Sequence, residues 1–251
     1  MDWFESWFDT PYYHILYKNH DFQEAETFIT KLTEFLKLPQ HAYVIDLACG
    51  KGRHSVFLHQ LGYNVLGLDL SQQSILHNQQ FATAAGVTPK LEFSVQDMRN
   101  PMGEENADAV LNLFTSFGYF DDENDDRSVF SSVNTALKDG GYFVLDYLNS
   151  QKVRQDLKEN DVVEKEGIQF SISKKIENDF VIKDIQFQDD GKPYHFFEKV
   201  KLHTPEKILE YAKDAGFERI KIWGDYQLND FNIDESPRCI NLFRKINSST
   251  K

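Results

Sequence analysis

The chain has 251 residues, of which 41% are hydrophobic and 27% are charged, as is typical of a globular protein with one large core. Its 27 basic and 40 acidic residues give a net charge of −13, which argues against nucleic acid or a membrane as the main partner. The two cysteines are far apart, and no stretch resembles a signal peptide or a membrane span, so we expect a cytoplasmic protein without disulfides or a metal site.

Residues 1–40 are expected to form an N-terminal helical cap. Apolar side chains recur there at helical spacing, at Ala25, Phe28, Ile29, Leu32, Phe35 and Leu36. The preceding segment, from Trp3 to Tyr17, is dense in aromatic residues. Two interpretations stay open for that segment: an apolar flap on the core, or the lid of a pocket.

Strands and helices alternate between residues 43 and 147. This alternation predicts a mostly parallel sheet whose strands are joined by right-handed crossovers. The expected strands cover 43–47, 65–69, 91–96, 109–114 and 142–147, and the expected helices cover 51–61, 71–86 and 124–137.

The pattern changes between residues 160 and 203. Apolar and polar residues alternate there, and Asn178-Asp179 and Asp189-Asp190-Gly191 supply turns, so we predict an inserted antiparallel β meander. The alternation slips between Ile182 and Ile185, which predicts a bulge or a shorter strand. The exposed edges of such a meander could wall off a substrate or pair two subunits as a homodimer.

The α/β pattern returns after the meander. Thr204 and Pro205 are suited to the start of a helix, and strands are expected at 217–223 and 239–246. The core is therefore expected to cover 41–150 and 204–247, with a β subdomain at 160–203 inserted into it.

A glycine-rich loop follows the first strand, with the sequence Asp46-Leu47-Ala48-Cys49-Gly50-Lys51-Gly52. Glycines let the backbone turn sharply and let a ligand approach it closely. The dinucleotide fingerprint needs a third glycine, and Ser55 stands at that position. The acid before the glycines also disfavours a pyrophosphate and suits a cationic ligand such as S-adenosylmethionine.

Two further acids end the next two strands. Asp69 lies 17 residues after Gly52, where a carboxylate can accept both hydroxyls of an adenosine ribose. Asp97 can accept from the adenine amine, and Met98 can pack on the ring. Simpler interpretations stay open for each acid, namely a helix-capping role for Asp69 and an ordinary loop position for Asp97.

With these motifs, residues 44–149 resemble the class I S-adenosylmethionine-dependent methyltransferases. The resemblance rests on Asp46-x-Ala48-Cys49-Gly50-x-Gly52, Leu68-Asp69-Leu70-Ser71, Gln96-Asp97-Met98 and Leu111 to Phe120. It implies a Rossmann-like α/β fold with a seven-stranded, mostly parallel sheet, helices on both faces and an antiparallel last strand. The aromatic N-terminal segment and the meander resemble the small-molecule branch, which includes amino-sugar and amine N-methyltransferases.

The site residues follow from the motifs and from this resemblance. We expect the cofactor S-adenosyl-L-methionine to be bound by Asp46, Ala48, Cys49, Gly50, Gly52, Arg53, Asp69, Leu70, Asp97, Met98, Phe114 and Tyr17. We expect the substrate to be bound by Tyr12, Tyr13, Phe117 and Tyr119. Arg53 could instead pair with a structural acid. The aromatic residues of both sets could instead be ordinary core residues. No catalytic residue is assigned, because the sulfonium methyl is already activated and positioning can supply much of the acceleration.

The predicted function is methyl transfer to nitrogen or oxygen of a small-molecule acceptor. The fourth-strand end, Asn112 to Tyr119, lacks the Asn/Asp-Pro-Pro-aromatic motif associated with adenine or glutamine methylation. Two alternatives stay open: an RNA or protein methyltransferase, and a non-catalytic regulator that binds the cofactor. A nicotinamide-dependent oxidoreductase is disfavoured by Ser55 and Asp46.

Overall fold

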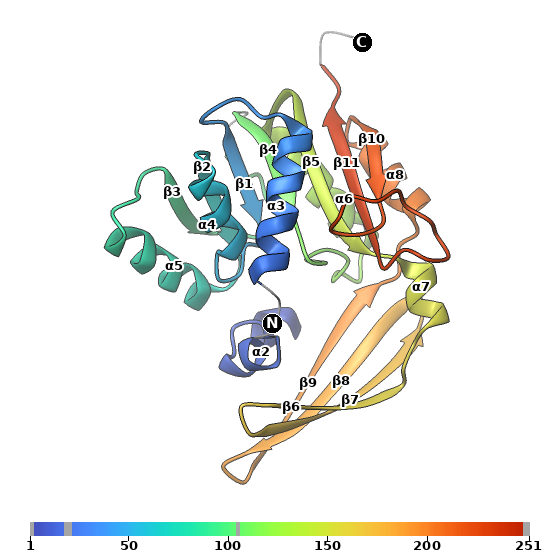
Figure 1. Cartoon of the computed structure of the whole chain (residues 1–251). Helices are drawn as coiled ribbons and strands as arrows, with labels where there is room; N and C mark the ends of the chain where they lie inside the picture. Colours follow the sequence, from blue (N-terminus) through green and yellow to red (C-terminus); the bar gives the residue numbers. More distant parts are fainter. Residues whose placement is uncertain (1–2, 18–21, 104–105, 248–251) are drawn as a thin grey trace.

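A seven-stranded sheet forms the centre of the chain. The computed structural model describes residues 3–17, 22–103 and 106–247 (Figure 1). The strand order is β10-β11-β5-β4-β1-β2-β3, and β11 runs antiparallel to both neighbours. This confirms the predicted Rossmann-like sheet with its reversed last strand. The strands are β1 Tyr43–Leu47, β2 Asn64–Asp69, β3 Leu91–Val95, β4 Ala107–Asn112, β5 Leu137–Leu148, β10 Phe217–Trp223 and β11 Arg238–Lys245.

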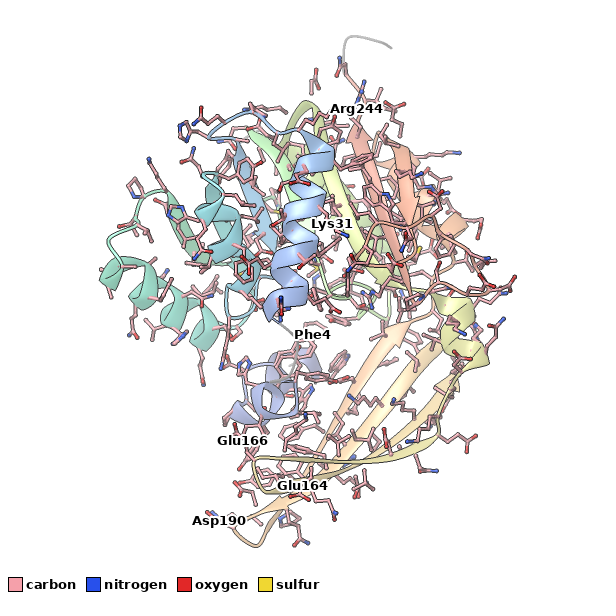
Figure 2. The ribbon with its side chains drawn as sticks, viewed as in Figure 1. Phe4, Lys31, Glu164, Glu166, Asp190 and Arg244 are labelled. Atoms are coloured by element: carbon pink, nitrogen blue, oxygen red, sulfur yellow. The ribbon has the colours of Figure 1, made fainter. Side chains whose placement is uncertain are left out.

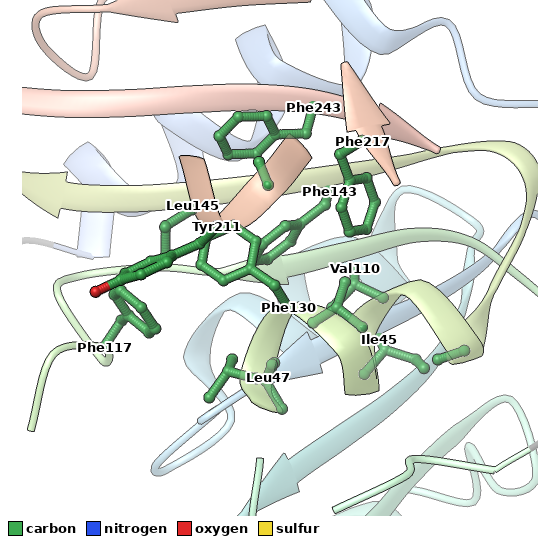
Figure 3. Close-up of a cluster of buried hydrophobic side chains, with 14 of the residues drawn as sticks. Ile45, Leu47, Val110, Phe117, Phe130, Phe143, Leu145, Tyr211, Phe217 and Phe243 are labelled. Atoms are coloured by element: carbon green, nitrogen blue, oxygen red, sulfur yellow. The ribbon is translucent and has the colours of Figure 1, made fainter. Parts of the chain in front are cut away.

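Helices cover both faces of this sheet, because successive residues of a strand point to opposite sides. Val44 packs in the cluster that includes α3 (Phe22–Leu36), α4 (Arg53–Gln60) and α5 (Gln72–Ala84). Its neighbour Ile45 packs in the other cluster, with α6 (Glu123–Ala136) and α8 (Pro205–Asp214), as Figure 3 shows. Among the helices of the described residues, none is both long enough and apolar enough to cross a membrane.

The fifth strand is longer than predicted. We expected the helix to end at 137 and the strand to begin at 142, whereas α6 ends at Ala136 and β5 begins at Leu137. Pairing with β4 shifts register between Ala107 and Ala109, so the glycine pair 140–141 forms an irregularity within the strand instead of preceding it. A Cβ on Gly141 would lie 2.9 Å from the carbonyl oxygen of Lys138, so this bend has no room for a side chain.

A second sheet, sheet B, contains four antiparallel strands in the order β6-β7-β8-β9. It follows β5 through the short helix α7 (Ser150–Gln155) and leads into α8, whose start at Thr204 was predicted correctly. The insertion therefore lies where the alternating sequence placed it. The strands are β6 Asn160–Lys165, β7 Ile168–Glu177, β8 Phe180–Asp189 and β9 Lys192–Lys201.

The predicted bulge or shortening in β8 is wrong. The strand pairs with β7 and β9 without a register shift. The apolar alternation breaks because Lys183 occupies a position on the same face as Ile185, opposite Glu198 of β9. The Lys183 ammonium lies 3.6 Å from the Glu198 carboxylate, and both side chains are largely buried. The strand is therefore regular, and the Lys183–Glu198 ion pair occupies a position where the alternation would place two apolar residues.

The aromatic N-terminal segment folds into α1 (Trp3–Trp7) and α2 (Pro11–Leu16) and contacts both sheets. Phe4 belongs to the core cluster of the large sheet, whereas Trp7 and Leu16 pack on the apolar face of sheet B. Figure 2 shows Phe4 at this junction, and Figure 1 shows α2 between the two sheets. The parts of the predicted cap at 1–2 and 18–21 lie outside the described residues.

Candidate functional site

A cavity of about 460 Å³ lies at the carboxyl ends of β1 to β4. Ligands of open parallel sheets bind at this edge, where neighbouring strand ends leave a crevice. The short helices α1 and α2 cover the cavity, so its walls come from five separate segments of the chain. The lining residues are Phe4, Phe8, Asp9, Tyr13, His14, Leu47, Ala48, Gly50, Asp69, Leu70, Ser71, Gln72, Ser74, Val95, Gln96, Asp97, Met98, Ser116, Tyr119 and Phe120.

The glycine loop forms one wall of the cavity. Ala48, Gly50 and Gly52 all have positive φ, at 61°, 53° and 71°, so the chain makes a tight left-handed turn into α4. A Cβ on Gly52 would lie 2.9 Å from the Phe93 ring, which excludes any other residue without rearrangement. Ala48 and Gly50 line the cavity, whereas Cys49 is buried behind them. The loop therefore presents backbone atoms to a ligand.

Asp69 joins the glycine loop to the end of β2. One carboxylate oxygen accepts the Gly50 N–H at 2.8 Å, and the other accepts the Ser71 N–H at 2.8 Å. Burial raises the pKa of Asp69, and these two backbone donors oppose that rise. A carboxylate has about four acceptor positions, so each oxygen keeps capacity for a ligand hydroxyl.

Asp97, at the end of β3, is held by a residue that the sequence reasoning missed. Arg99 Nε lies 3.1 Å from each Asp97 oxygen, and its Nη2 lies 2.6 Å from Oδ2. Burial acts to raise the pKa of Asp97, but the hydrogen bonds from Arg99 outweigh it and the pKa is lowered. The Arg99 guanidinium also lies 4.7 Å from the centre of the Phe120 ring, which lines the cavity. Arg99 thus orients the carboxylate and keeps it ionised.

Asp46 is buried beneath the glycine loop and does not line the cavity. Ser55 Oγ donates to its Oδ2 at 2.5 Å. Burial raises the pKa of Asp46 to about 6, although the Ser55 hydrogen bond opposes this shift. Ser55 stands where a dinucleotide loop has its third glycine. The serine at this position therefore gives the buried Asp46 a hydrogen-bond donor that a glycine would lack.

Half of the predicted site residues meet at the cavity, and the others lie behind or beside it. The lining residues include Ala48, Gly50, Asp69, Leu70, Asp97, Met98, Tyr13 and Tyr119. They do not include Asp46, Cys49, Gly52, Arg53, Phe114, Tyr17, Tyr12 or Phe117.

Three of the predicted aromatic residues make other contacts. Phe117 has no exposed surface and packs against the rings of Phe130, Tyr147 and His203 in the core. The Tyr12 hydroxyl donates to Asp189 at 2.8 Å, and the Tyr17 hydroxyl donates to Glu198 at 2.7 Å. The two tyrosines therefore attach α2 to sheet B, and Phe117 supports the chain below the cavity.

Phe114 and Arg53 form a stack beside the glycine loop. The Phe114 ring centre lies 5.0 Å from the centre of the His54 ring and 5.0 Å from that of the Tyr226 ring. The Arg53 guanidinium lies 4.8 Å from the Phe114 ring centre. This stack extends from α4 to the loop before β11 and supports the turn that follows β4.

The roof of the cavity contributes residues that no sequence motif marked. Phe4, Phe8, Asp9 and His14 come from α1, α2 and the turn between them. Asp9 accepts a hydrogen bond from Ser71 Oγ at 2.5 Å, which joins this roof to the loop after β2. Burial lowers the pKa of His14 to about 4, so His14 is neutral at pH 7. The only sequence signal for the roof was the aromatic density of residues 3–17.

The cavity has a negative electrostatic character. Asp9, Asp69 and Asp97 line it, and no lysine or arginine is among the lining residues of the described chain. Arg99 compensates the charge of Asp97 from behind the lining, whereas the part of the chain that the structure describes shows no such ion pair for Asp69, so the lining carboxylates still favour a positively charged ligand. The same arrangement disfavours the pyrophosphate of a dinucleotide, which needs positive potential at the glycine loop.

Comparison with known proteins agrees with this geometry. The profile of a methyltransferase domain family matches residues 39–213. The chain belongs to this methyltransferase family. A putative methyltransferase of Bacillus subtilis strain 168 is 28% identical over 220 residues, which cover 84% of this chain and 86% of the relative. The predicted family and enzyme class are therefore confirmed.

Solved structures share the fold of this methyltransferase. An S-adenosylmethionine-dependent methyltransferase from Clostridium acetobutylicum ATCC 824 aligns with a TM-score of 0.80 at 20% identity, covering 94% of this chain and 96% of the other. A sugar N-methyltransferase from Streptoalloteichus sp. ATCC 53650 aligns with a TM-score of 0.70 at 20% identity, covering 94% and 93%. Both alignments extend over nearly the whole chain, so they include the inserted sheet B as well as the core.

Proposed function

We propose that this methyltransferase binds S-adenosylmethionine in the cavity and transfers its methyl group to the nitrogen of a small-molecule amine. The observation that carries the proposal is the pair of carboxylates, Asp69 and Asp97, on neighbouring strand ends of one cavity, where no lysine or arginine is among the lining residues that the structure describes. The sugar N-methyltransferase among the solved structures supports an amine acceptor. The net charge of −13 supports a small molecule over nucleic acid.

The residues fit the parts of the cofactor in order along the sheet edge. Asp69 would accept the ribose hydroxyls, Asp97 would accept the adenine amine, and Met98 would pack on the adenine ring. The methionine end would lie over the loop at Ala48 to Gly50, with Asp46 beneath it. The methyl group would then face the end of β4, where Ser116 and Tyr119 line the cavity.

The bound cofactor supplies a methyl group activated by the sulfonium. The lone pair of the acceptor nitrogen would form the bond to the methyl carbon as the carbon–sulfur bond breaks, and the electron pair of that broken bond would stay on the sulfur of S-adenosylhomocysteine. The extra proton on the methylated nitrogen would be released to solvent once the product leaves the cavity. The protein aligns the two reactants and excludes water under α1 and α2, and such positioning can contribute about 7–11 kcal/mol.

Nitrogen is favoured over oxygen by the pKa values of the histidine and the two tyrosines that line the cavity. A hydroxyl acceptor needs a base with a pKa near the working pH. His14 has a pKa of about 4, and burial raises the pKa of Tyr13 and of Tyr119 above the tyrosine range. A neutral amine needs no such base, because its lone pair is already available.

Ligand binding and product formation together test this proposal. We expect S-adenosylmethionine and S-adenosylhomocysteine to raise the melting temperature, with NAD as the negative control. Amino sugars and small amines, each compared with the matching hydroxyl compound and with RNA, should then be assayed for S-adenosylhomocysteine formation. Turnover with amines only is expected. Stabilisation by NAD alone would overturn the cofactor assignment, and cofactor binding without turnover on any acceptor class would indicate a regulator.

We also expect the affinity for S-adenosylmethionine to fall by about tenfold between pH 7 and pH 5. The folded-state pKa of Asp46 is raised from 3.8 to about 6, and a bound cation favours the ionised carboxylate, so protonation competes with binding below pH 6. In the ligand-free protein, the same shift removes stability as the pH rises from about 3.8 to about 6. Isothermal titration at several pH values measures the profile. The variant Asp46→Asn should show a flatter one, and an unchanged slope would contradict the role of Asp46.

A further inference from the structure

The turn after β4 has an unfavourable backbone. Phe114 and Thr115 have φ values of 61° and 62°, in the left-handed region that residues with a Cβ rarely adopt. Two such residues in succession, neither of them glycine, asparagine or aspartate, persist only where surrounding contacts determine the conformation. The contacts around Phe114 and Thr115 therefore have to stabilise this backbone conformation.

Asp146 of β5 supplies the first set of contacts. Its side chain is fully buried, and its Oδ2 accepts the Phe114 N–H at 2.7 Å and the Tyr226 hydroxyl at 3.1 Å. Its backbone oxygen accepts the Thr115 N–H at 3.1 Å. One residue thus binds the backbone of both left-handed positions.

Arg238, the first residue of β11, supplies the second set. Its Nε and Nη2 lie 2.8 Å and 2.7 Å from Asp146 Oδ1, and Nη2 also donates to Thr115 Oγ1 at 2.7 Å. The two Asp146 oxygens therefore receive hydrogen bonds from Phe114, Tyr226 and Arg238, which is the condition under which a buried charge is tolerated. The planar fork of arginine brings two nitrogens to Asp146 while one of them also reaches Thr115, whereas a lysine offers a single nitrogen.

The turn places side chains at the cavity. Ser116 follows it directly, Tyr119 comes shortly after, and both line the wall beyond β4. The Tyr119 hydroxyl donates to the backbone oxygen of Thr115 at 2.5 Å, and Ser116 Oγ donates to that of Leu113 at 3.1 Å. A change in the backbone at Phe114 and Thr115 would therefore move this wall.

We propose that Asp146 and Arg238 are positioning residues for methyl transfer, which hold the turn at Phe114 and Thr115 so that Ser116 and Tyr119 face the transferred methyl. The inference rests on the proposed function. Neither residue is among those that line the cavity. Asp69 ends β2 and Asp97 follows β3, and both strands lie on the far side of β1 from this turn. The pair should therefore affect the methyl position separately from nucleoside binding.

Two cofactor analogues separate these effects without a known acceptor. S-adenosylhomocysteine has no group at the methyl position, whereas sinefungin has an amine there. Titration calorimetry would give the dissociation constant of each for the wild type, Asp146→Asn, Arg238→Lys and Thr115→Val. The matched control is Arg244→Lys, because Arg244 lies on the same strand in an exposed ion pair with Glu218 at 3.5 Å. Thr115→Val removes only the hydroxyl contact with Arg238 and serves if the other variants fold poorly.

We expect Asp146→Asn, Arg238→Lys and Thr115→Val to bind S-adenosylhomocysteine within about twofold of the wild type. The ratio of the sinefungin and S-adenosylhomocysteine dissociation constants should change by about tenfold, because displacement of the cavity wall by 1 Å can cost that much or more. Arg244→Lys should change neither constant. An unchanged preference overturns the proposal, and so does a parallel loss of both affinities, which would mean that the pair supports the whole cavity.

Amide exchange gives an independent measurement. The Phe114 and Thr115 amides should exchange faster in Asp146→Asn and in Arg238→Lys than in the wild type, and unchanged protection would overturn the proposal. If the wild type binds neither analogue, the proposed function fails, and with it the role of the turn in methyl transfer. Amide exchange would then still show whether the pair holds the turn, so the two failures can be distinguished.

Discussion

Asp69→Asn should raise the dissociation constant of S-adenosylmethionine by about a hundredfold. The carboxylate would accept two ribose hydroxyls, and each hydrogen bond to a charged group contributes about 1.5–3 kcal/mol. The variant also exchanges an acceptor for an amide donor beside the N–H groups of Gly50 and Ser71. Both changes act against binding, and titration calorimetry at pH 7 measures their sum.

Asp108→Asn is the matched control for this experiment. Asp108 also accepts a backbone N–H, from Tyr43 at 2.8 Å, but it lies near the start of β4, at the opposite end of the strand from the cavity. The affinity of the Asp108→Asn variant for S-adenosylmethionine should stay within about twofold of the wild type. Equal losses in the two variants would show a general effect on the sheet. Unchanged affinity in Asp69→Asn would remove Asp69 from the cofactor site.

Phe117→Ala should lower the free energy of unfolding by about 3–5 kcal/mol, because truncation of a fully buried phenylalanine leaves a cavity in the core. Phe117 was predicted as a substrate residue, yet its ring lies among Phe130, Tyr147 and His203. Urea unfolding with an unchanged m-value measures the loss. Phe117→Leu keeps most of the volume and should lose less than about 1.5 kcal/mol.

Phe81→Ala provides the comparison for Phe117. Phe81 lies on α5 with 47% of its surface exposed, so its truncation should change stability by less than about 0.5 kcal/mol. A Phe117→Ala variant as stable as Phe81→Ala would contradict the core assignment. It would return Phe117 to the list of candidate substrate contacts.

The parts of the fold that could be predicted are those with short-range signals. Periodicity located the strands, and glycines and caps located the turns at Gly50, Ser71 and Thr204. Asp69 and Asp97 could be placed because the carboxyl ends of parallel strands share one edge of a sheet. An acid at the end of a buried strand can thus be recognised from the local sequence, and its place at one edge of the sheet follows from that.

The remaining features depend on contacts between distant segments. Nothing in the sequence near Lys183 indicates that Glu198 and Tyr17 will surround it, so its position resembled a bulge. Nothing near Phe117 distinguishes a core ring from a pocket ring, because both follow a buried strand. Arg99 left a weak signal, since an arginine two residues after a strand-end acid is placed to pair with it.

The roof of the cavity rests on sheet B. Trp7 donates to Glu198 at 2.8 Å and stacks with Phe196 at 4.5 Å between ring centres, and Tyr12 reaches Asp189 at the far end of the sheet. Residues 3–17 and 160–201 therefore form one unit, although about 140 residues separate them in the chain. In a chimera that exchanges sheet B alone between two relatives, the new sheet B would not match the contacts of the original roof, residues 3–17. Acceptor specificity should be transferable only when both segments are exchanged together.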